Sequence, residues 1–333
     1  MKHITGKKMG WLIRRELWEH KGMLLWTPAV IGILMTLLGG LLAFGAVART
    51  KVRTALIVNG EEISWGAVLN AQSFAHRKSE IIQAVANNYT YTGAPLFLAL
   101  GFLVFFYCLS ALHDDRRDRS ILFWKSLPVS DAQTVLSKAA VALLVTPMIV
   151  LAAASLSSLA LILILCGVLA ANDIHVVAEL ASAPGLYLGP LRLFGLLPVY
   201  MLWALPTVGW LLLVSSWARS KVLLWAVGVP LLLLVLVAWA GKMAQADLPV
   251  HWLQTNVIAR ALVGVLPGSW YVFEPALLPA TPAHADSGPR MLQFDLFANS
   301  WSSLALPSVW VGALLGVGMI AGAIRLRRWR EEG

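Results

Sequence analysis

The residues of this chain that could do chemistry are concentrated in one segment of mixed charge, residues 113–131. The segment reads His113-Asp114-Asp115-Arg116-Arg117-Asp118-Arg119, followed by Ile121, Phe123, Trp124 and Leu127 and ending at Ser130-Asp131. A histidine beside two carboxylates can bind a metal, but these three residues are consecutive and arginines follow at once, so we expect a solvated loop. The chain has no GxxxxGK[ST], HExxH or GxSxG motif. We therefore expect a chain that is not itself catalytic and that binds no metal or cofactor.

Six long apolar runs must position this segment. They occupy residues 23–47, 95–112, 139–171, 196–217, 222–241 and 308–324. At ~1.5 Å rise per helical residue, such runs cover the ~30 Å hydrocarbon core of a bilayer. Barrel strands would alternate apolar and polar residues, and a stretch such as 231–237, which reads LLLLVLV, does not. The expected fold class is all-α, a polytopic membrane protein with six transmembrane helices.

The composition supports a membrane protein. Hydrophobic residues make up 59% of the chain and charged residues 13%, whereas soluble domains carry about 25% charged residues. The net charge of +9 could indicate a nucleic-acid partner, but the basic residues flank apolar runs and form no soluble patch. We expect them to contact the headgroups of the lipid bilayer, and we expect no nucleic acid partner.

The distribution of basic residues predicts the orientation. If the N-terminus is cytoplasmic, 17 of the 26 Lys and Arg residues lie on the cytoplasmic side, where the loops are also shorter. One basic cluster does not fit this orientation: Arg49, Lys51 and Arg53 follow the first run and would lie on the outer side. Six spans place both termini on the same side, and both ends are basic, so we expect both termini to be cytoplasmic.

The chain then divides by loop length. Residues 1–22 are expected to form a cytoplasmic interfacial helix, residues 23–324 the six-helix transmembrane domain, and residues 325–333 a basic cytoplasmic tail. The outer loops are residues 48–94, 172–195 and 242–307, and the main cytoplasmic loop is 113–138. We expect an amphipathic helical stretch at 63–85, short helices around 253–265, and Ser130 or Asp131 as the N-cap of the third span.

The N-terminal segment has the pattern of a helix that lies on a membrane surface. Trp11, Ile13, Leu17 and Trp18 offer apolar contacts, while Arg14, Arg15, Glu16 and Glu19 stay polar. A basic helix with tryptophan on its apolar side is typical of an interfacial helix. The alternative is an ordinary positively charged flank of the first span.

The mixed-charge loop admits two interpretations from its residues alone. In the first, it is solvated, and Phe123 and Trp124 are anchored among lipid headgroups. In the second, a short helix places Ile121, Phe123, Trp124 and Leu127 in a groove on a soluble partner, with the charged turn at the rim.

Glycines and cysteines add packing expectations. Gly312, Gly316, Gly318 and Gly322 form two GxxxG spacings in the sixth run, which permit close helix approach within the subunit or across a dimer. Cys108 and Cys166 lie inside apolar runs and are expected to be packed thiols.

Two segments resemble a known family. The loop Asp114–Asp131 and the N-terminal Ile13-Arg14-Arg15-Glu16-Leu17-Trp18-Glu19-His20-Lys21-Gly22 resemble the corresponding segments of the membrane-spanning permease subunits of bacterial type-2 ABC exporters. The order of six spans and the total length are similar along nearly the whole chain. The outer loops are larger than in the compact lipid and polysaccharide exporters of that family, so the resemblance does not assign a substrate.

The resemblance implies a permease subunit in the bacterial inner membrane, paired with a second permease subunit and with two ABC ATPase subunits. Those partners would bind ATP and Mg. The resemblance also implies that the loop Asp114–Asp131 is a coupling loop that docks on the ATPase. Its docking residues would be Asp114, Asp115, Arg116, Arg117, Asp118, Arg119, Ile121, Phe123, Trp124 and Leu127. The scarcity of charge in the spans suggests an amphipathic or hydrophobic cargo, such as a lipid or an antimicrobial peptide. The alternative function is a non-transporting membrane scaffold or sensor whose outer loops bind a ligand.

Overall fold

The computed structural model describes residues 2–53, 56–58, 61–63, 72–117, 129–171, 174, 176–245, 249–277 and 296–329. Almost all of these residues are helical, and six helical segments are long and apolar enough to cross a membrane. They are Gly22–Ala46, Lys78–Arg117, Asp131–Ala170, Pro184–Trp217, Val222–Ala244 and Pro307–Trp329. Each segment overlaps one of the six predicted runs, so the expected multi-pass, all-α membrane fold is confirmed.

Several segments combine more than one helix. Helix α1 (Lys2–Glu19) leads through a π-helical turn (Gly22–Trp26) into α2 (Thr27–Arg53). The second segment combines part of α4 (Gln72–Asn88), a 3-10 turn (Tyr89–Gly93), α5 (Ala94–Ala111) and the short α6 (His113–Arg117). The third combines α8 (Asp131–Ala140), a π-helical turn (Val141–Val145) and α9 (Thr146–Ala170).

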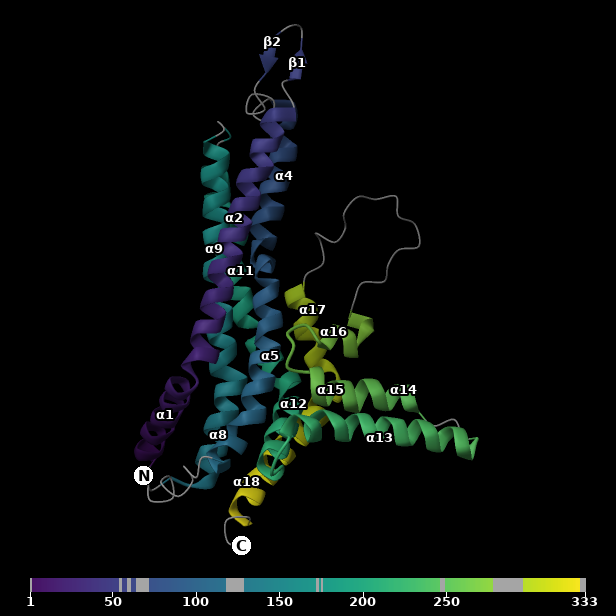
Figure 1. The fold of residues 1–333 in the computed structure, drawn as a ribbon. Helices are drawn as coiled ribbons and strands as arrows, with labels where there is room; N and C mark the ends of the chain where they lie inside the picture. The colour runs from purple at the N-terminus through teal and green to yellow at the C-terminus, as the bar shows by residue number, and fades with distance from the viewer. Residues whose placement is uncertain are drawn as a thin grey trace.

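One of the remaining three spans also combines two helices, and the other two are single helices. The fourth joins α11 (Pro184–Gly195) to α12 (Leu197–Trp217), the fifth is α13 (Val222–Ala244) and the sixth is α18 (Pro307–Trp329). Because α18 continues to Trp329, residues 325–329 of the predicted tail are helical. The only strands among the described residues are β1 (Leu56–Val58) and β2 (Glu61–Ile63), which form a small antiparallel hairpin beyond α2 (Figure 1).

The predicted helix start at Ser130 or Asp131 is confirmed. Ser130 is the N-cap of α8 and forms a capping box with Gln133, since each side chain accepts a hydrogen bond from the other residue's backbone N–H. Helix α4 covers residues 72–85 of the amphipathic stretch expected at 63–85, but Ile63 ends strand β2, and residues 64–71 lie outside the described part of the chain. The last outer loop contains α14 (Val250–Leu253), a π-helical turn (Gln254–Ala259) and α15 (Arg260–Val263). These cover the short helices expected around 253–265. The remaining short helices are α10 (Val177–Ser182), α16 (Trp270–Phe273) and α17 (Leu296–Ser302).

Small residues set how closely the helices approach. Helices α2 and α9 run in the same direction, and Cβ atoms at Gly32 and Gly39 would lie within 2.5 Å of the Ser157 and Leu161 side chains. Helices α12 and α18 pack backbone against backbone, since a Cβ at Gly316 would lie 2.6 Å from the Leu205 carbonyl oxygen. The first GxxxG spacing is therefore used within the subunit, whereas Gly318 has open space beside it.

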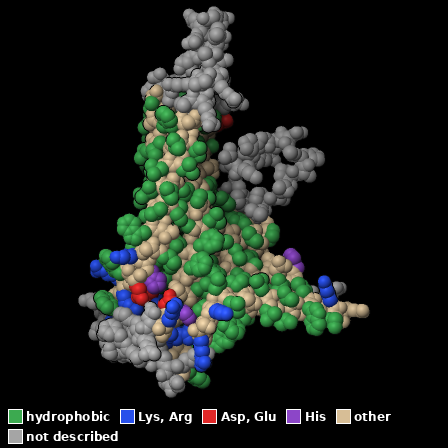
Figure 2. All heavy atoms as spheres, in the orientation of Figure 1, with side chains coloured by type: hydrophobic (Ala, Val, Ile, Leu, Met, Phe, Trp, Pro, Cys, Tyr) green, Lys and Arg blue, Asp and Glu red, His purple; other side chains and the backbone are tan. Residues whose placement is uncertain are grey.

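The surface is apolar over most of its height. Helices α2 and α13 expose rows of leucine, isoleucine and valine, and α13 extends away from the column that contains α2, α4 and α9 (Figure 1). Lys and Arg gather with Asp, Glu and His near the end that carries α1, α8 and the end of α18 (Figure 2). An apolar wall above a charged end is the pattern expected of a protein that lies in a bilayer.

Candidate functional site

The charged end of the molecule contains a buried ion cluster that joins four helices. Lys138 of α8 is fully buried, and its Nζ lies 3.0 Å from Glu16 Oε1 of α1 and 3.4 Å from Asp115 Oδ2 of α6. Arg327, near the end of α18, places its Nη1 3.3 Å from the same Asp115 oxygen. Its Nε forms a further ion pair of 3.3 Å with Asp131, at the start of α8.

The cluster is balanced in charge. Two buried cations, Lys138 and Arg327, face two buried carboxylates, Glu16 and Asp115. The Tyr107 hydroxyl of α5 donates a further hydrogen bond of 3.1 Å to Glu16 Oε2. Buried ion pairs add little net stability, because desolvation offsets their attraction, but removal of one partner is costly. The arrangement therefore fixes the relative positions of α1, α5, α6, α8 and α18.

A second set of contacts fixes α6 against the end of α12. The Arg116 guanidinium donates to the carbonyl oxygens of Ser215 and of Ala218, the latter at 2.9 Å. The Ser215 hydroxyl accepts from the backbone N–H groups of Leu112 and His113 and donates to the Leu109 carbonyl. These bonds satisfy backbone groups at the end of α5 that have no helical partner.

Both ends of the predicted coupling loop are thus anchored. On the N-terminal side, Asp115 and Arg116 join α6 to α8, α18 and α12. On the C-terminal side, the capping box begins α8, and Asp131 pairs with Arg327. A displacement of the intervening segment would act on these helices together, because packed elements with satisfied polar networks move as units.

Of the predicted docking residues that the structure describes, two are exposed and two contact other helices of the same chain. Asp114 and Arg117 are exposed, whereas Asp115 is buried in the ion cluster and Arg116 bonds to α12. The remaining predicted docking residues lie outside the described part of the chain: Asp118, Arg119, Ile121, Phe123, Trp124 and Leu127.

Of the residues predicted to lie on the membrane surface, some are exposed on α1 and one is buried. Trp11, Arg14 and Trp18 are exposed on α1, and Arg15 pairs with Glu19 at 3.3 Å. Glu16, expected on the polar face, is 1% exposed and belongs to the ion cluster. Helix α1 therefore presents tryptophan and arginine outward and holds one carboxylate inward.

Sequence reasoning missed two members of the cluster. From the sequence, Lys138 and Arg327 are two of the basic residues that flank apolar runs, and nothing in the pattern predicts that they are buried. The available signal was the spacing between Asp131 and Lys138. Lys138 follows Asp131 by seven residues, or two helical turns, so both lie on one face of α8. That spacing alone does not identify the carboxylates that face them.

A second buried charge lies against the middle of α12, away from the ion cluster. Arg260, from the predicted outer loop, is 7% exposed, and its guanidinium lies 4.4 Å from the centre of the Trp203 ring. Thr207 donates a 2.7 Å hydrogen bond to the Arg260 carbonyl. The Nε and Nη2 atoms have no hydrogen-bond partner among the described residues. The pKa of this guanidinium is lowered by burial, and the Glu274 carboxylate opposes that shift.

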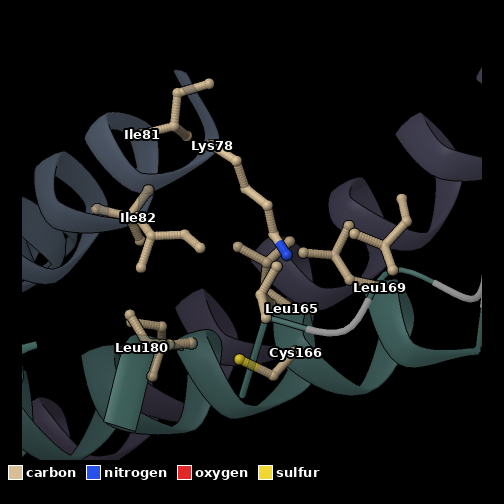
Figure 3. Close-up of a pocket in the computed structure, with 11 residues that line it drawn as sticks. Lys78, Ile81, Ile82, Leu165, Cys166, Leu169 and Leu180 are labelled. Atoms are coloured by element: carbon tan, nitrogen blue, oxygen red, sulfur yellow. The ribbon is translucent and has the colours of Figure 1, made fainter. Parts of the chain in front are cut away.

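An apolar cavity of about 340 Å³ lies between α4, α9 and α10. Its walls include Ile82, Leu165, Cys166 and Leu180, and the Lys78 side chain crosses its mouth toward α9 (Figure 3). Lys78 Nζ pairs with Glu179 Oε1 at 2.7 Å. Both cysteines, Cys108 and Cys166, are free and buried, as expected.

No protein-family model, curated protein or solved structure matches this chain.

Proposed function

We propose that this multi-pass membrane protein is the permease subunit of an ATP-driven ABC exporter in the bacterial inner membrane. In this proposal both termini and the 114–131 loop face the cytoplasm, and a separate ABC ATPase binds ATP and Mg. A second permease subunit completes the membrane-spanning pair, and the cargo is amphipathic or hydrophobic, either a lipid or an antimicrobial peptide.

The observation that carries the proposal is the anchoring of both ends of one charged loop to four helices. A permease without a nucleotide site must receive force from a partner. The Glu16–Lys138–Asp115–Arg327 cluster offers a path for that force, because it joins the loop to α1, α8 and α18. Exposed Asp114 is available for a rim contact with a partner, whereas Asp115 and Arg116 hold the loop to its own subunit.

The test is co-purification with the ATPase encoded in the neighbouring reading frame, followed by ATP hydrolysis in lipid. Phe123→Ala/Trp124→Ala should lose the ATPase, since each truncated interface aromatic costs about 2 kcal/mol or more of binding free energy. Leu232→Ala/Leu233→Ala, which removes two exposed side chains from α13, is the matched control and should retain it. Normal assembly and activity of the Phe123/Trp124 variant would refute the docking role.

A second candidate is a scaffold or sensor that binds a ligand on its outer side. The cavity between α4, α9 and α10 is the observation that favours it, because its volume lies in the lower range of ligand sites. Absence of a Walker-containing ATPase gene beside this one, together with purification without an ATPase, would favour this candidate over the exporter.

A further inference from the structure

A strongly basic cavity lies at the charged end of the molecule, separate from the ion cluster. It has a volume of about 530 Å³ and is formed by α6 and by the turn that joins α12 to α13. The described residues that line it are His113, Arg116, Arg117, Ala218, Arg219, Ser220 and Lys221. Every charged or titratable side chain in this described lining is basic.

Three of the cations lack a counter-charge within the described part of the chain. Arg116 is held by carbonyl oxygens of α12, but Arg117, Arg219 and Lys221 form no ion pair with a described acid. The neighbouring carboxylates have other partners: Asp114 lies 3.2 Å from His113 Nδ1, and Asp115 faces Lys138 and Arg327. Cations gathered around one cavity repel each other, so an anion in the cavity would be stabilised.

The turn that carries Arg219 and Lys221 is short. Lys221 adopts the left-handed conformation, with φ of 51°, which is uncommon for a lysine. Arg116 ties α6 to the same turn through the Ala218 carbonyl. The cavity is therefore held in shape by contacts that do not use Arg117, Arg219 or Lys221.

The surroundings of the turn indicate a membrane interface. Trp217 and Trp225, on either side of the turn, pack edge to face with ring centres 4.9 Å apart, and both are partly exposed. Leu223 and Leu224 are exposed at the start of α13. Tryptophan beside exposed leucine and arginine is typical of the headgroup level of a bilayer.

We infer that this cavity binds the phosphate of an anionic phospholipid headgroup, with the acyl chains lying along the start of α13. Basic pockets between membrane helices recognise such headgroups through their charge. The exposed Leu223 and Leu224 would contact the chains, which is why a lipid fits better than a soluble anion. This inference does not depend on an ATPase partner.

The test compares two sets of three charge removals in the full-length protein, purified in a neutral detergent. Arg117→Gln/Arg219→Gln/Lys221→Asn removes charge from the cavity, and asparagine tolerates the left-handed conformation at position 221. The control, Arg14→Gln/Arg325→Gln/Arg328→Gln, removes three exposed charges outside the cavity. The probes are dioctanoyl phosphatidylglycerol and dioctanoyl phosphatidylcholine, measured by titration calorimetry or native mass spectrometry.

The native protein and the control should bind phosphatidylglycerol at least about tenfold more tightly than phosphatidylcholine. The cavity variant should lose that preference, since each basic residue near the surface contributes roughly fivefold to anionic lipid binding. Arg219→Lys/Lys221→Arg keeps both charges and should keep the preference, which separates loss of charge from loss of folding.

Three results would overturn the inference. Equal loss of binding in the control would mean that only net charge matters. Displacement of the lipid by an equal concentration of inorganic phosphate would indicate a site for a free anion. Normal lipid binding by the cavity variant, combined with loss of a co-expressed ATPase, would show that the cavity docks an acidic protein surface.

Discussion

Lys138 lies 3.0 Å from Glu16, and both side chains are buried although 122 residues separate them in the chain. The contact joins the N-terminal helix α1 to the first turns of the third span. Asp115 and Arg327 extend it to the end of the second span and to the end of the sixth. One lysine thus links α1, α6 and α8 at the charged end of the molecule.

Replacement of Lys138 by methionine should destabilise the protein. The change leaves Glu16 and Asp115 buried without the cation that bridges them, while Arg327 still pairs with Asp115. Loss of one partner of a buried pair costs about 3–5 kcal/mol. Thermal unfolding in detergent measures the effect. Lys242→Met, which removes an exposed lysine at the far end of α13, should leave the unfolding temperature nearly unchanged.

A double-mutant cycle tests whether the Glu16–Lys138 pair itself carries the effect. Glu16→Gln combined with Lys138→Met should cost less than the sum of the single changes, with a coupling of about 0.5–3 kcal/mol. Additive effects would mean that Lys138 acts through Asp115 or through packing.

Replacement by alanine should affect the stability of the protein differently at two glycines of α18, Gly316 and Gly318. A Cβ at Gly316 would lie 2.6 Å from the Leu205 carbonyl oxygen, whereas a Cβ at Gly318 would meet nothing within 4 Å. Gly316→Ala should destabilise by about 1–3 kcal/mol, because the backbone of α12 must move. Gly318→Ala should be neutral or slightly stabilising. Equal unfolding temperatures for both variants would contradict the close α12–α18 contact.

Arg260→Met should leave the protein as stable as before or make it more stable. The buried guanidinium gains about 2 kcal/mol from the Trp203 ring. Burial of a cation whose Nε and Nη2 atoms donate no hydrogen bond to a described residue costs several kcal/mol. Thermal unfolding checks the sign, with exposed Arg192→Met as the control. A loss of more than about 2 kcal/mol would show that Glu274 and Trp203 together compensate the buried charge.

Cysteine labelling tests the proposed orientation. In a chain without Cys108 and Cys166, a cysteine at position 126 should resist a membrane-impermeant thiol reagent added to intact cells. A cysteine at position 287 should react with it, because the 17-to-9 distribution of basic residues predicts opposite sides for the two loops. Reaction of position 126 from outside would reverse the orientation and remove the coupling loop from the cytoplasm.

The sequence by itself determined the features that depend on neighbours along the chain. Six spans follow from run length and hydropathy, because the bilayer imposes a length on any helix that crosses it. The start of α8 follows from Ser130, whose hydroxyl bonds three residues ahead. The short helices expected around 253–265 are present at 250–263.

Only the tertiary structure decided which distant residues meet. In the sequence, Glu16 lies on the polar face of its helix and Lys138 is a basic residue beside a span. In the structure, the packing of α1 on α8 buries both side chains. The two GxxxG spacings look alike in the sequence, yet Gly316 faces α12 and Gly318 faces open space. Arg260 belongs to a loop by composition, but that loop folds back onto Trp203. Helix period and hydropathy fix a residue's position within its own helix, whereas the partner of each face is chosen by the packing of all the helices together.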